Sequence, residues 1–158
     1  MFFRRRKRIS DEELTEKIKK EYYNIRLKLY EAILERSNAF TYSNVPLGRI
    51  PSIIGNRLEV AHSSVTIKTK WYWRKKVLAW YKGGDVIYFN SRCLNRPLCS
   101  LVGTYAHELT HVADSYTKEY FFGHGDNSPK GKEESAPYWI GRVASRVAKW
   151  ACEKEGNK

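Results

Sequence analysis

Apolar side chains recur at helical spacing near the start of the chain. Between Leu14 and Ile33 an apolar residue returns every three or four positions, as on one face of an α-helix. Ser10 and Glu13 stand where a capping box would begin such a helix. The pattern predicts a long amphipathic helix over residues 10–36, whose single apolar stripe covers a sheet.

The chain then changes character twice. Residues 37–64 contain two prolines and two glycines, which predicts a loop-rich stretch with His62 as a surface or hydrogen-bonded residue rather than a ligand. Residues 65–90 follow with the alternation typical of β-strands. A Gly-Gly pair predicts a tight turn between a second strand, 77–81, and a third, 85–90.

The first of these strands has two different faces. Its apolar face, expected in the core, consists of Val65, Ile67, Thr69, Trp71 and Trp73. Its opposite face includes Lys68, Lys70, Tyr72 and Arg74. A basic face with an aromatic ring can bind nucleic acid, and Tyr72 is the expected stacking residue because it shares the basic face.

Two further helices follow in the predicted order of elements. Pro97 suits the first turn of a helix whose apolar stripe runs from Leu98 to Tyr116. A last helix is expected from Ser135 to Glu153. Its packing stripe would consist of Ile140, Val143, Val147 and Trp150.

These elements predict an α+β fold in a single domain over residues 10–155. A small twisted β sheet would pack with the N-terminal helix, the helix that begins at Pro97 and the C-terminal helix. Residues 1–9 are expected to form a basic disordered arm, and residues 156–158 a frayed tail.

Composition excludes two broad classes of protein. With 42% hydrophobic and 14% aromatic residues, the chain is not intrinsically disordered. No apolar run approaches the roughly twenty residues that cross a bilayer, and charged residues stand where a signal peptide needs its apolar segment. We therefore expect an intracellular, monomeric protein without a membrane partner.

Three cysteines without a C-x-x-C pair predict reduced thiols and no zinc ribbon.

The net charge of +12 is unevenly distributed. Residues 97–158 contain eight basic and eight acidic residues, so the whole excess lies in residues 1–96. Such a field favours a polyanion such as nucleic acid, or serves solubility alone. The expected DNA contacts are the basic run of residues 4–8 and the basic strand face around Lys70.

The candidate chemistry lies in residues 107–111, which read His-Glu-Leu-Thr-His. Histidines four positions apart project from the same face of a helix, where both can bind one Zn²⁺, and the glutamate between them can take a proton from water. The motif predicts His107 and His111 as zinc ligands and Glu108 as general base. The alternative is that these are ordinary polar positions on a half-buried helix.

A catalytic zinc site needs a third protein ligand. His124 stands between Gly123 and Gly125, which would let a tight loop fold back toward the helix. Glu133 and Glu134 are the alternatives, although the dipole of the last helix also explains acidic residues just before it.

Supporting residues of two kinds are expected near the metal. Asp114 is either a hydrogen-bond partner of a ligating imidazole or a solvated surface carboxylate. A tyrosine can stabilise the oxyanion that forms during peptide hydrolysis, and Tyr116, Tyr120 and Tyr138 are the candidates.

With these motifs the chain resembles the SprT-like (Spartan-type) zinc metallopeptidases over roughly residues 65–150. The resemblance rests on the strand sequence Val86–Asn90, the motif Ala106–His111 and the Gly-His-Gly of residues 123–125, in that order. Two features depart from the family. Asp126 is followed by Asn-Ser-Pro instead of a nearby aromatic residue, and the four-cysteine zinc ribbon of many members is missing.

The resemblance implies a zincin-like fold and one catalytic zinc held by His107, His111 and His124, with Glu108 as general base and acid. The expected function is that of a zinc-dependent metalloendopeptidase acting on protein or peptide substrates, with DNA-associated proteins as the implied class. Two other functions stay open. One is a basic nucleic-acid-binding protein with a structural or inactive zinc site, and the other is a zinc hydrolase acting on something other than peptide.

Overall fold

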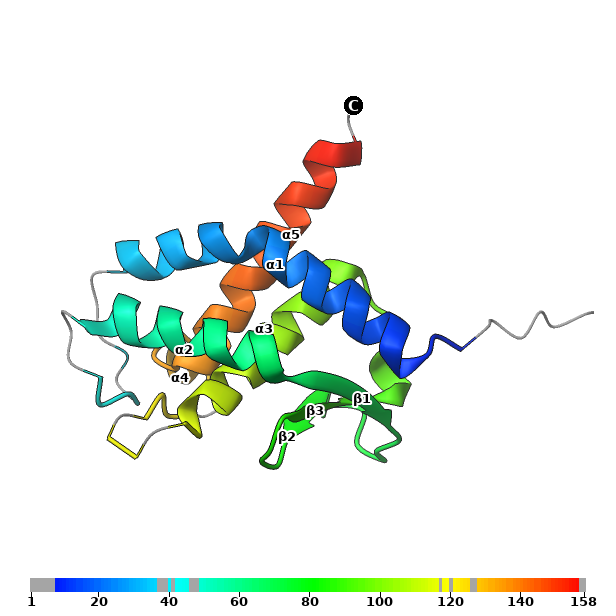
Figure 1. The fold of residues 1–158 in the computed structure, drawn as a ribbon, viewed down its shortest axis with the longest axis horizontal. Coiled ribbons are helices and arrows are strands. Elements are labelled where there is room, and N and C mark those ends of the chain that lie inside the picture. Colours follow the sequence, from blue (N-terminus) through cyan, green and yellow to red (C-terminus); the bar gives the residue numbers. More distant parts are fainter. Residues whose placement is uncertain are drawn as a thin grey trace, which may run out of the picture.

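The computed structural model describes residues 8–36, 40, 42–45, 49–116, 118–119, 121–125 and 128–156. Over these residues the chain has an α+β fold with five α-helices and one small three-stranded mixed sheet (Figure 1). The helices are α1 (Asp11–Glu35), α2 (Ile50–Ser64), α3 (Leu98–Asp114), α4 (Pro129–Glu133) and α5 (Ala136–Gly156), and the strands are β1 (Thr66–Lys70), β2 (Ala79–Tyr81) and β3 (Val86–Asn90). The α+β class expected from the sequence is confirmed. Among the described helices, none combines the length with the apolar character that crossing a membrane requires.

The expected terminal segments lie mostly outside the described residues. Of the basic arm, only Arg8 and Ile9 are described, and Ile9 packs against the core instead of belonging to a free arm. Of the frayed tail, only Gly156 is described, and it is the last residue of α5.

The first predicted helix is confirmed as α1. Ser10 caps it, because its Oγ accepts a hydrogen bond from the N–H of Glu13 at 3.1 Å. Its buried stripe consists of Leu14, Ile18, Tyr22, Ile25, Leu29 and Ile33. The helix packs on α2, α3 and α5 as well as on β1, where the carboxylate of Asp11 accepts hydrogen bonds from the N–H and hydroxyl of Thr69. It therefore covers helices and sheet together rather than the sheet alone.

The loop prediction is wrong for residues 50–64, which form α2. Pro51 lies in the first turn of the helix, where a missing N–H removes no hydrogen bond, and Gly55 is tolerated in its interior. His62 is buried on this helix with its Nδ1 2.9 Å from the hydroxyl of Tyr105. It is a hydrogen-bonded core residue, one of the two ordinary roles expected for it.

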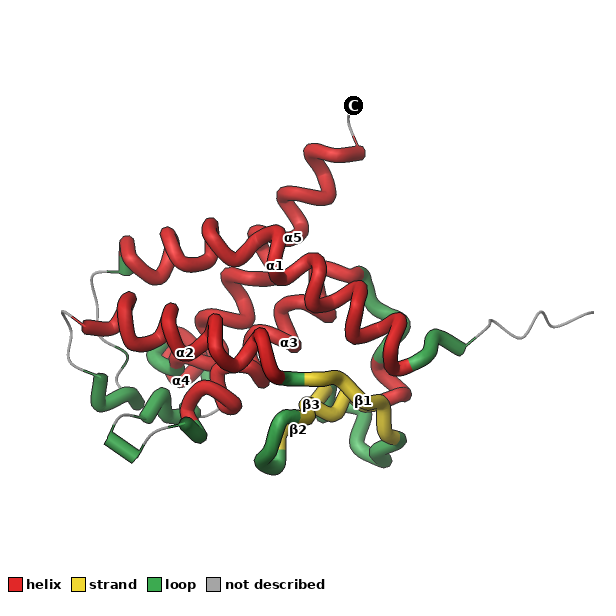
Figure 2. The backbone as a smooth tube through the Cα atoms, viewed as in Figure 1, coloured by secondary structure: helices red, strands yellow, loops and turns green. Residues whose placement is uncertain are grey.

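The three strands occur in the predicted order along the chain but pair as β1-β3-β2 (Figure 2). β1 runs parallel to the central strand β3, and β2 runs antiparallel to it at one edge. β1 ends at Lys70, opposite the last residue of β3, so the alternation of faces stops there. Trp71 and Trp73 are consequently 63% and 58% exposed, and the prediction that they belong to the core is wrong.

The last helix is confirmed as α5, with bounds slightly different from those expected. It begins one residue after Ser135 and extends beyond Glu153, and the short helix α4 before it was not predicted. Of the expected stripe, Ile140 and Val143 are buried, whereas Trp150 is largely exposed beneath the ammonium group of Lys28.

α3 and α5 approach each other closely where Gly103 faces Gly141. A Cβ on Gly103 would lie 2.6 Å from the Cβ of Ser145 and 2.8 Å from the carbonyl oxygen of Gly141. A Cβ on Gly141 would lie 2.8 Å from the carbonyl oxygen of Gly103 and 3.0 Å from the Cβ of His107. Only glycine allows this backbone separation, so the two residues set the distance between α5 and the helix that carries the His-Glu-Leu-Thr-His motif.

Substitution of Gly103 by alanine should separate the two helices. We expect Gly103→Ala to lower the free energy of unfolding by about 1–3 kcal/mol, because the added methyl overpacks a close backbone contact. Gly55→Ala is the matched control, since nothing lies within 4 Å of its added Cβ on α2. It should stabilise the protein by about 0.5–1 kcal/mol. Equal effects of the two substitutions in urea unfolding would refute the close-contact argument.

Candidate metal centre

α3 presents its polar motif on a face next to its buried stripe. Leu109 and Val112 are fully buried in the core, which fixes the rotation of the helix about its axis. His107 and His111 then project one turn apart from the adjoining face, with their Nε2 atoms 3.3 Å apart. Two nitrogens bound to one zinc at about 2.1 Å in tetrahedral geometry stand about 3.4 Å apart. The spacing of this pair therefore fits a shared zinc ion.

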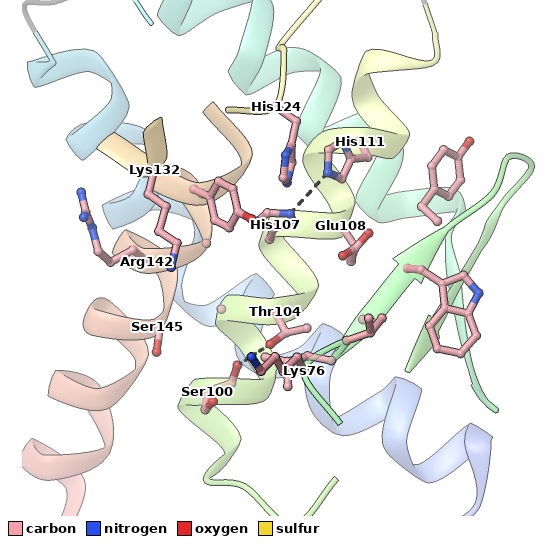
Figure 3. A pocket seen from close by; sticks show the side chains of 18 of the residues that line it. Lys76, Ser100, Thr104, His107, Glu108, His111, His124, Lys132, Arg142 and Ser145 are labelled. Atoms are coloured by element: carbon pink, nitrogen blue, oxygen red, sulfur yellow. Dashed lines mark hydrogen bonds between the residues drawn. The ribbon is translucent and has the colours of Figure 1, made fainter. Parts of the chain in front are cut away.

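The structure brings His124 to this pair. The nitrogen atoms of His107, His111 and His124 that could bind a metal all lie within 4.8 Å of one another, and the His124 ring stacks on that of His111 (Figure 3). The two alternative ligands are not part of this cluster. The carboxylate of Glu133 forms ion pairs with Arg36 and Arg142 instead.

Close backbone contacts hold the loop that carries His124. A Cβ on Gly123 would overlap the backbone of Tyr42, and a Cβ on Gly125 would overlap the backbone of Gly131. Neither glycine has a positive φ, so both are needed for space rather than for a left-handed turn. The loop folds back to the helix as expected, but it does so because the two glycines allow close packing rather than because they allow a left-handed turn.

Asp114 takes part in the same anchoring. Its Oδ1 accepts a hydrogen bond from the N–H of Phe122 at 2.8 Å, and the Phe122 side chain is buried in the core. Asp114 therefore fixes the loop two residues before His124. It is neither the hydrogen-bond partner of an imidazole nor the solvated surface carboxylate that the sequence suggested. Asn44 adds a second anchor, since its Oδ1 accepts a hydrogen bond from the N–H of Phe121.

Burial keeps the histidines of α3 neutral. Burial, and then the neighbouring His111 and His124, lower the pKa of His107 to about 3. Burial, and then His124, lowers the pKa of His111 to about 4. Neutral imidazole is the form that binds metal, so both histidines are ready to bind near pH 7.

A backbone contact from α5 orients the first histidine. His107 forms a hydrogen bond with the backbone of Pro137, one residue after the start of α5. Hydrogen bonds of this kind fix the ring orientation and tautomer of metal-ligating histidines. Sequence reasoning could not identify this contact, because a backbone carbonyl leaves no trace in residue type.

Glu108 lies between the two histidines in sequence and beside them in space (Figure 3). It is only 8% exposed, and burial raises the pKa of its carboxyl group to about 7. A carboxyl group with a pKa in this range can both accept and release a proton near neutral pH.

The cluster opens into a cleft of about 940 Å³ between α3, α5 and the edge strand β2. β2 and α3 run in the same direction along the cleft. In the segments before them, the Sγ of Cys93 donates a hydrogen bond to the carbonyl oxygen of Lys75, and at their ends the hydroxyl of Tyr81 lies 3.1 Å from the Oγ of Ser115. Of the three candidate tyrosines, Tyr138 lines the cleft and packs against the rings of His107 and His124. Tyr116 instead lies beside Ser64, and Tyr120 is outside the described residues.

Comparison of the chain with family profiles, curated proteins and solved structures finds no match. The donor set itself fits zinc, because three imidazoles leave one coordination position for water or substrate on the side of the cleft.

Asp114 provides a test of the anchoring role. Asp114→Ala removes the acceptor for the Phe122 N–H and should weaken zinc binding by about 10- to 100-fold, the usual effect of losing a residue that supports a ligand. Asp114→Asn keeps an oxygen acceptor without the charge and should retain most of the affinity. Competition with a chromophoric chelator measures both. If Asn weakened zinc binding as much as Ala, the charge of Asp114 would matter rather than its hydrogen bond.

Proposed function

We propose that this protein is a zinc-dependent metalloendopeptidase of the SprT-like kind, with a zincin-like arrangement of the ligand helix beside a sheet edge. The observation that carries the proposal is the three-histidine cluster with a buried glutamate on the wall of an open cleft. A structural zinc site is closed by four protein ligands, whereas this cluster offers three among the described residues. The same reasoning disfavours the alternative of a purely structural zinc site.

His107, His111 and His124 would hold the metal. When bound, zinc supplies Lewis acidity that polarises a carbonyl group and makes water a better nucleophile. Glu108 accepts the proton of the attacking water, and its raised pKa lets it return that proton to the leaving amine. Because Glu108 is held on α3 next to both ligands, both proton transfers need no movement of the backbone.

The edge strand β2 gives the substrate a place to lie. β2 pairs with β3 on one side, and its residues line the cleft on the other. An extended peptide can add to such an edge through main-chain hydrogen bonds. Such pairing would place a peptide bond of the substrate next to the three histidines, where water can attack it.

Tyr138 is the tyrosine placed to stabilise the developing oxyanion. Its ring centre lies 4.7 Å from that of His107 and 4.5 Å from that of His124. A Tyr138→Phe variant that bound zinc and kept full kcat would exclude this role.

The central test is casein cleavage by the wild type and by Glu108→Gln. The substitution removes the proton acceptor and leaves the three imidazoles in place, so we expect zinc to remain near one per chain and cleavage to fall by at least about 100-fold. His124→Ala should lose both zinc and activity.

Two results would contradict the proposal. Wild-type cleavage by Glu108→Gln would remove the general base from the mechanism. A wild type that binds zinc without cleaving casein or peptides would favour an inactive site or a hydrolase for another substrate.

DNA is the second proposed partner, and an exposed aromatic loop supports it. Trp71 and Trp73 are exposed, with the guanidinium groups of Arg92 and Arg74 over their respective rings. Exposed rings beside cations are the usual means of stacking on single-stranded nucleic acid. Of the expected basic face, Lys68 and Lys70 are exposed on β1, whereas Tyr72 packs against Trp80 instead of being free to stack.

Removal of both tryptophans should weaken binding to single-stranded DNA. We expect Trp71→Ala/Trp73→Ala to lower the affinity for a labelled oligonucleotide by at least about tenfold, since each stacked base contributes about 1–3 kcal/mol. Tyr23→Ala is the matched control, because Tyr23 is an exposed ring on α1 that also has a guanidinium, that of Arg26, above it. If the Tyr23 variant lost as much affinity for DNA as the double variant, or if the double variant lost none, the loop would be excluded as the DNA-binding surface. Fluorescence anisotropy at two salt concentrations measures the affinities.

A further inference from the structure

The cleft has an excess of basic side chains on its walls. Its basic residues are Lys76, Arg96, Lys132 and Arg142, and its acidic residues are Glu108 and Asp114. Asp114 is already engaged by the N–H of Phe122, and Glu108 belongs to the proposed proton transfer. Arg142 is neutralised by Glu133 outside the cleft. Lys76, Arg96 and Lys132 thus line the cleft without an ion pair to any described carboxylate.

Arg96 lies at the end of the cleft where α3 begins. Its Nε donates to the carbonyl oxygen of Cys93 at 2.6 Å, and its Nη1 donates to the hydroxyls of Ser100 and Thr104 at 3.0 and 2.9 Å. All three acceptors are neutral, and Nη2 is buried without a hydrogen-bond partner in the part of the chain that the structure describes. Burial lowers the pKa of this guanidinium, although its ordinary value is high enough for it to remain charged near pH 7.

No described carboxylate forms an ion pair with Arg96. A half-buried charge with neutral partners alone is destabilising, because the hydrogen bonds replace only part of the lost hydration. An anion bound near it would offset that cost. Its hydrogen bonds also hold the guanidinium in one place on α3, so little conformational entropy is lost when an anion binds.

Lys76 supplies an accessible cation at the same end. It is exposed and lines the cleft just before β2 (Figure 3). The carbonyl oxygen of its neighbour Lys75 accepts a hydrogen bond from the Sγ of Cys93, whose own carbonyl oxygen accepts one from Arg96, so the two basic residues belong to the same end of the cleft. Thr104 precedes His107 by three residues, a rise of about 4.5 Å along the helix. One residue of extended peptide spans about 3.3 Å. A substrate lying along β2 would therefore place a side chain near Lys76 within a few residues of the bond at the histidines.

We propose that this end of the cleft is a carboxylate-binding subsite, in which Lys76 pairs directly with an acidic group of the peptide and Arg96 supports it with a fixed charge. The subsite selects substrates that carry an acidic residue, or a chain end, within a few residues of the cleaved bond. The subsite proposal rests on the proposed peptidase function, because that function makes the substrate a peptide. Its anion is part of the peptide, since the subsite lies inside the cleft through which the peptide passes.

The test uses pairs of fluorogenic peptides that differ only by Glu or Gln at successive positions around the cleaved bond. We expect one Glu peptide to have a kcat/KM at least about tenfold above its Gln partner, the effect of one charge-assisted contact, and the ratio to shrink with added salt. Peptides ending in a free acid or an amide at that position show whether the carboxylate comes from a side chain or a chain end; a preference in either pair supports the subsite.

Lys76→Gln should reduce the ratio of kcat/KM between the Glu and Gln peptides to near one. Lys75→Gln is the matched control, because Lys75 is an exposed neighbour that does not line the cleft. Arg96→Met should reduce the ratio too, and the Lys76 variant keeps the test decisive if loss of the Arg96 hydrogen bonds impairs folding. Equal kcat/KM within every Glu/Gln pair and within the acid/amide pair would overturn the proposal.

A binding measurement separates this proposal from the proposed function. The affinity of zinc-loaded Glu108→Gln for each labelled peptide needs no catalysis. Preference for the Glu peptide, lost in Lys76→Gln, would support the subsite even if the wild type cleaved nothing. Equal affinities within the Glu/Gln pairs and within the acid/amide pair would overturn the subsite even if casein were cleaved.

Discussion

The close approach of α3 and α5 at Gly103 and Gly141 is the constraint on which the candidate metal centre depends. It brings the backbone of α5 against the Cβ of His107, so that the ligand helix cannot rotate away from its neighbour. In the first turn of α5, the backbone carbonyl of Pro137 accepts a hydrogen bond from His107, and the ring of Tyr138 lies beside two of the histidines. The last helix is thus part of the metal centre although it contributes no ligand.

The third histidine depends on a different set of contacts. The loop around His124 is held between the backbones of Tyr42 and Gly131, and Asp114 and Asn44 accept hydrogen bonds from its N–H groups. These anchors come from segments far apart in the sequence, and they bring a histidine from outside α3 against the two on it. Because these anchors are contacts within the protein, they lower the entropic cost of coordination.

Local patterns in the sequence predicted α1, α3, α5, the three strands and the cluster of histidines, because periodicity and ligand spacing are properties of neighbouring residues. The failures had two causes, distant contacts and local ambiguity. Trp71 and Trp73 continue the alternation of β1, but pairing with β3 ends at Lys70, and no local signal marks that end. The helix α2 was missed because proline in a first turn looks the same in sequence as proline in a loop.

Asn90 connects the aromatic loop with the cleft. At the end of β3, its Nδ2 donates to the carbonyl oxygens of Tyr72, Arg74 and Val77 at 3.3, 3.1 and 2.9 Å, so one buried amide fixes the turn from the tryptophans to β2. A turn held at three points resists changes of shape. If single-stranded DNA binds the tryptophans as proposed, its effect on cleavage should come mainly from holding DNA-bound proteins near β2 and raising their local concentration, because a switch would need a second arrangement of this turn.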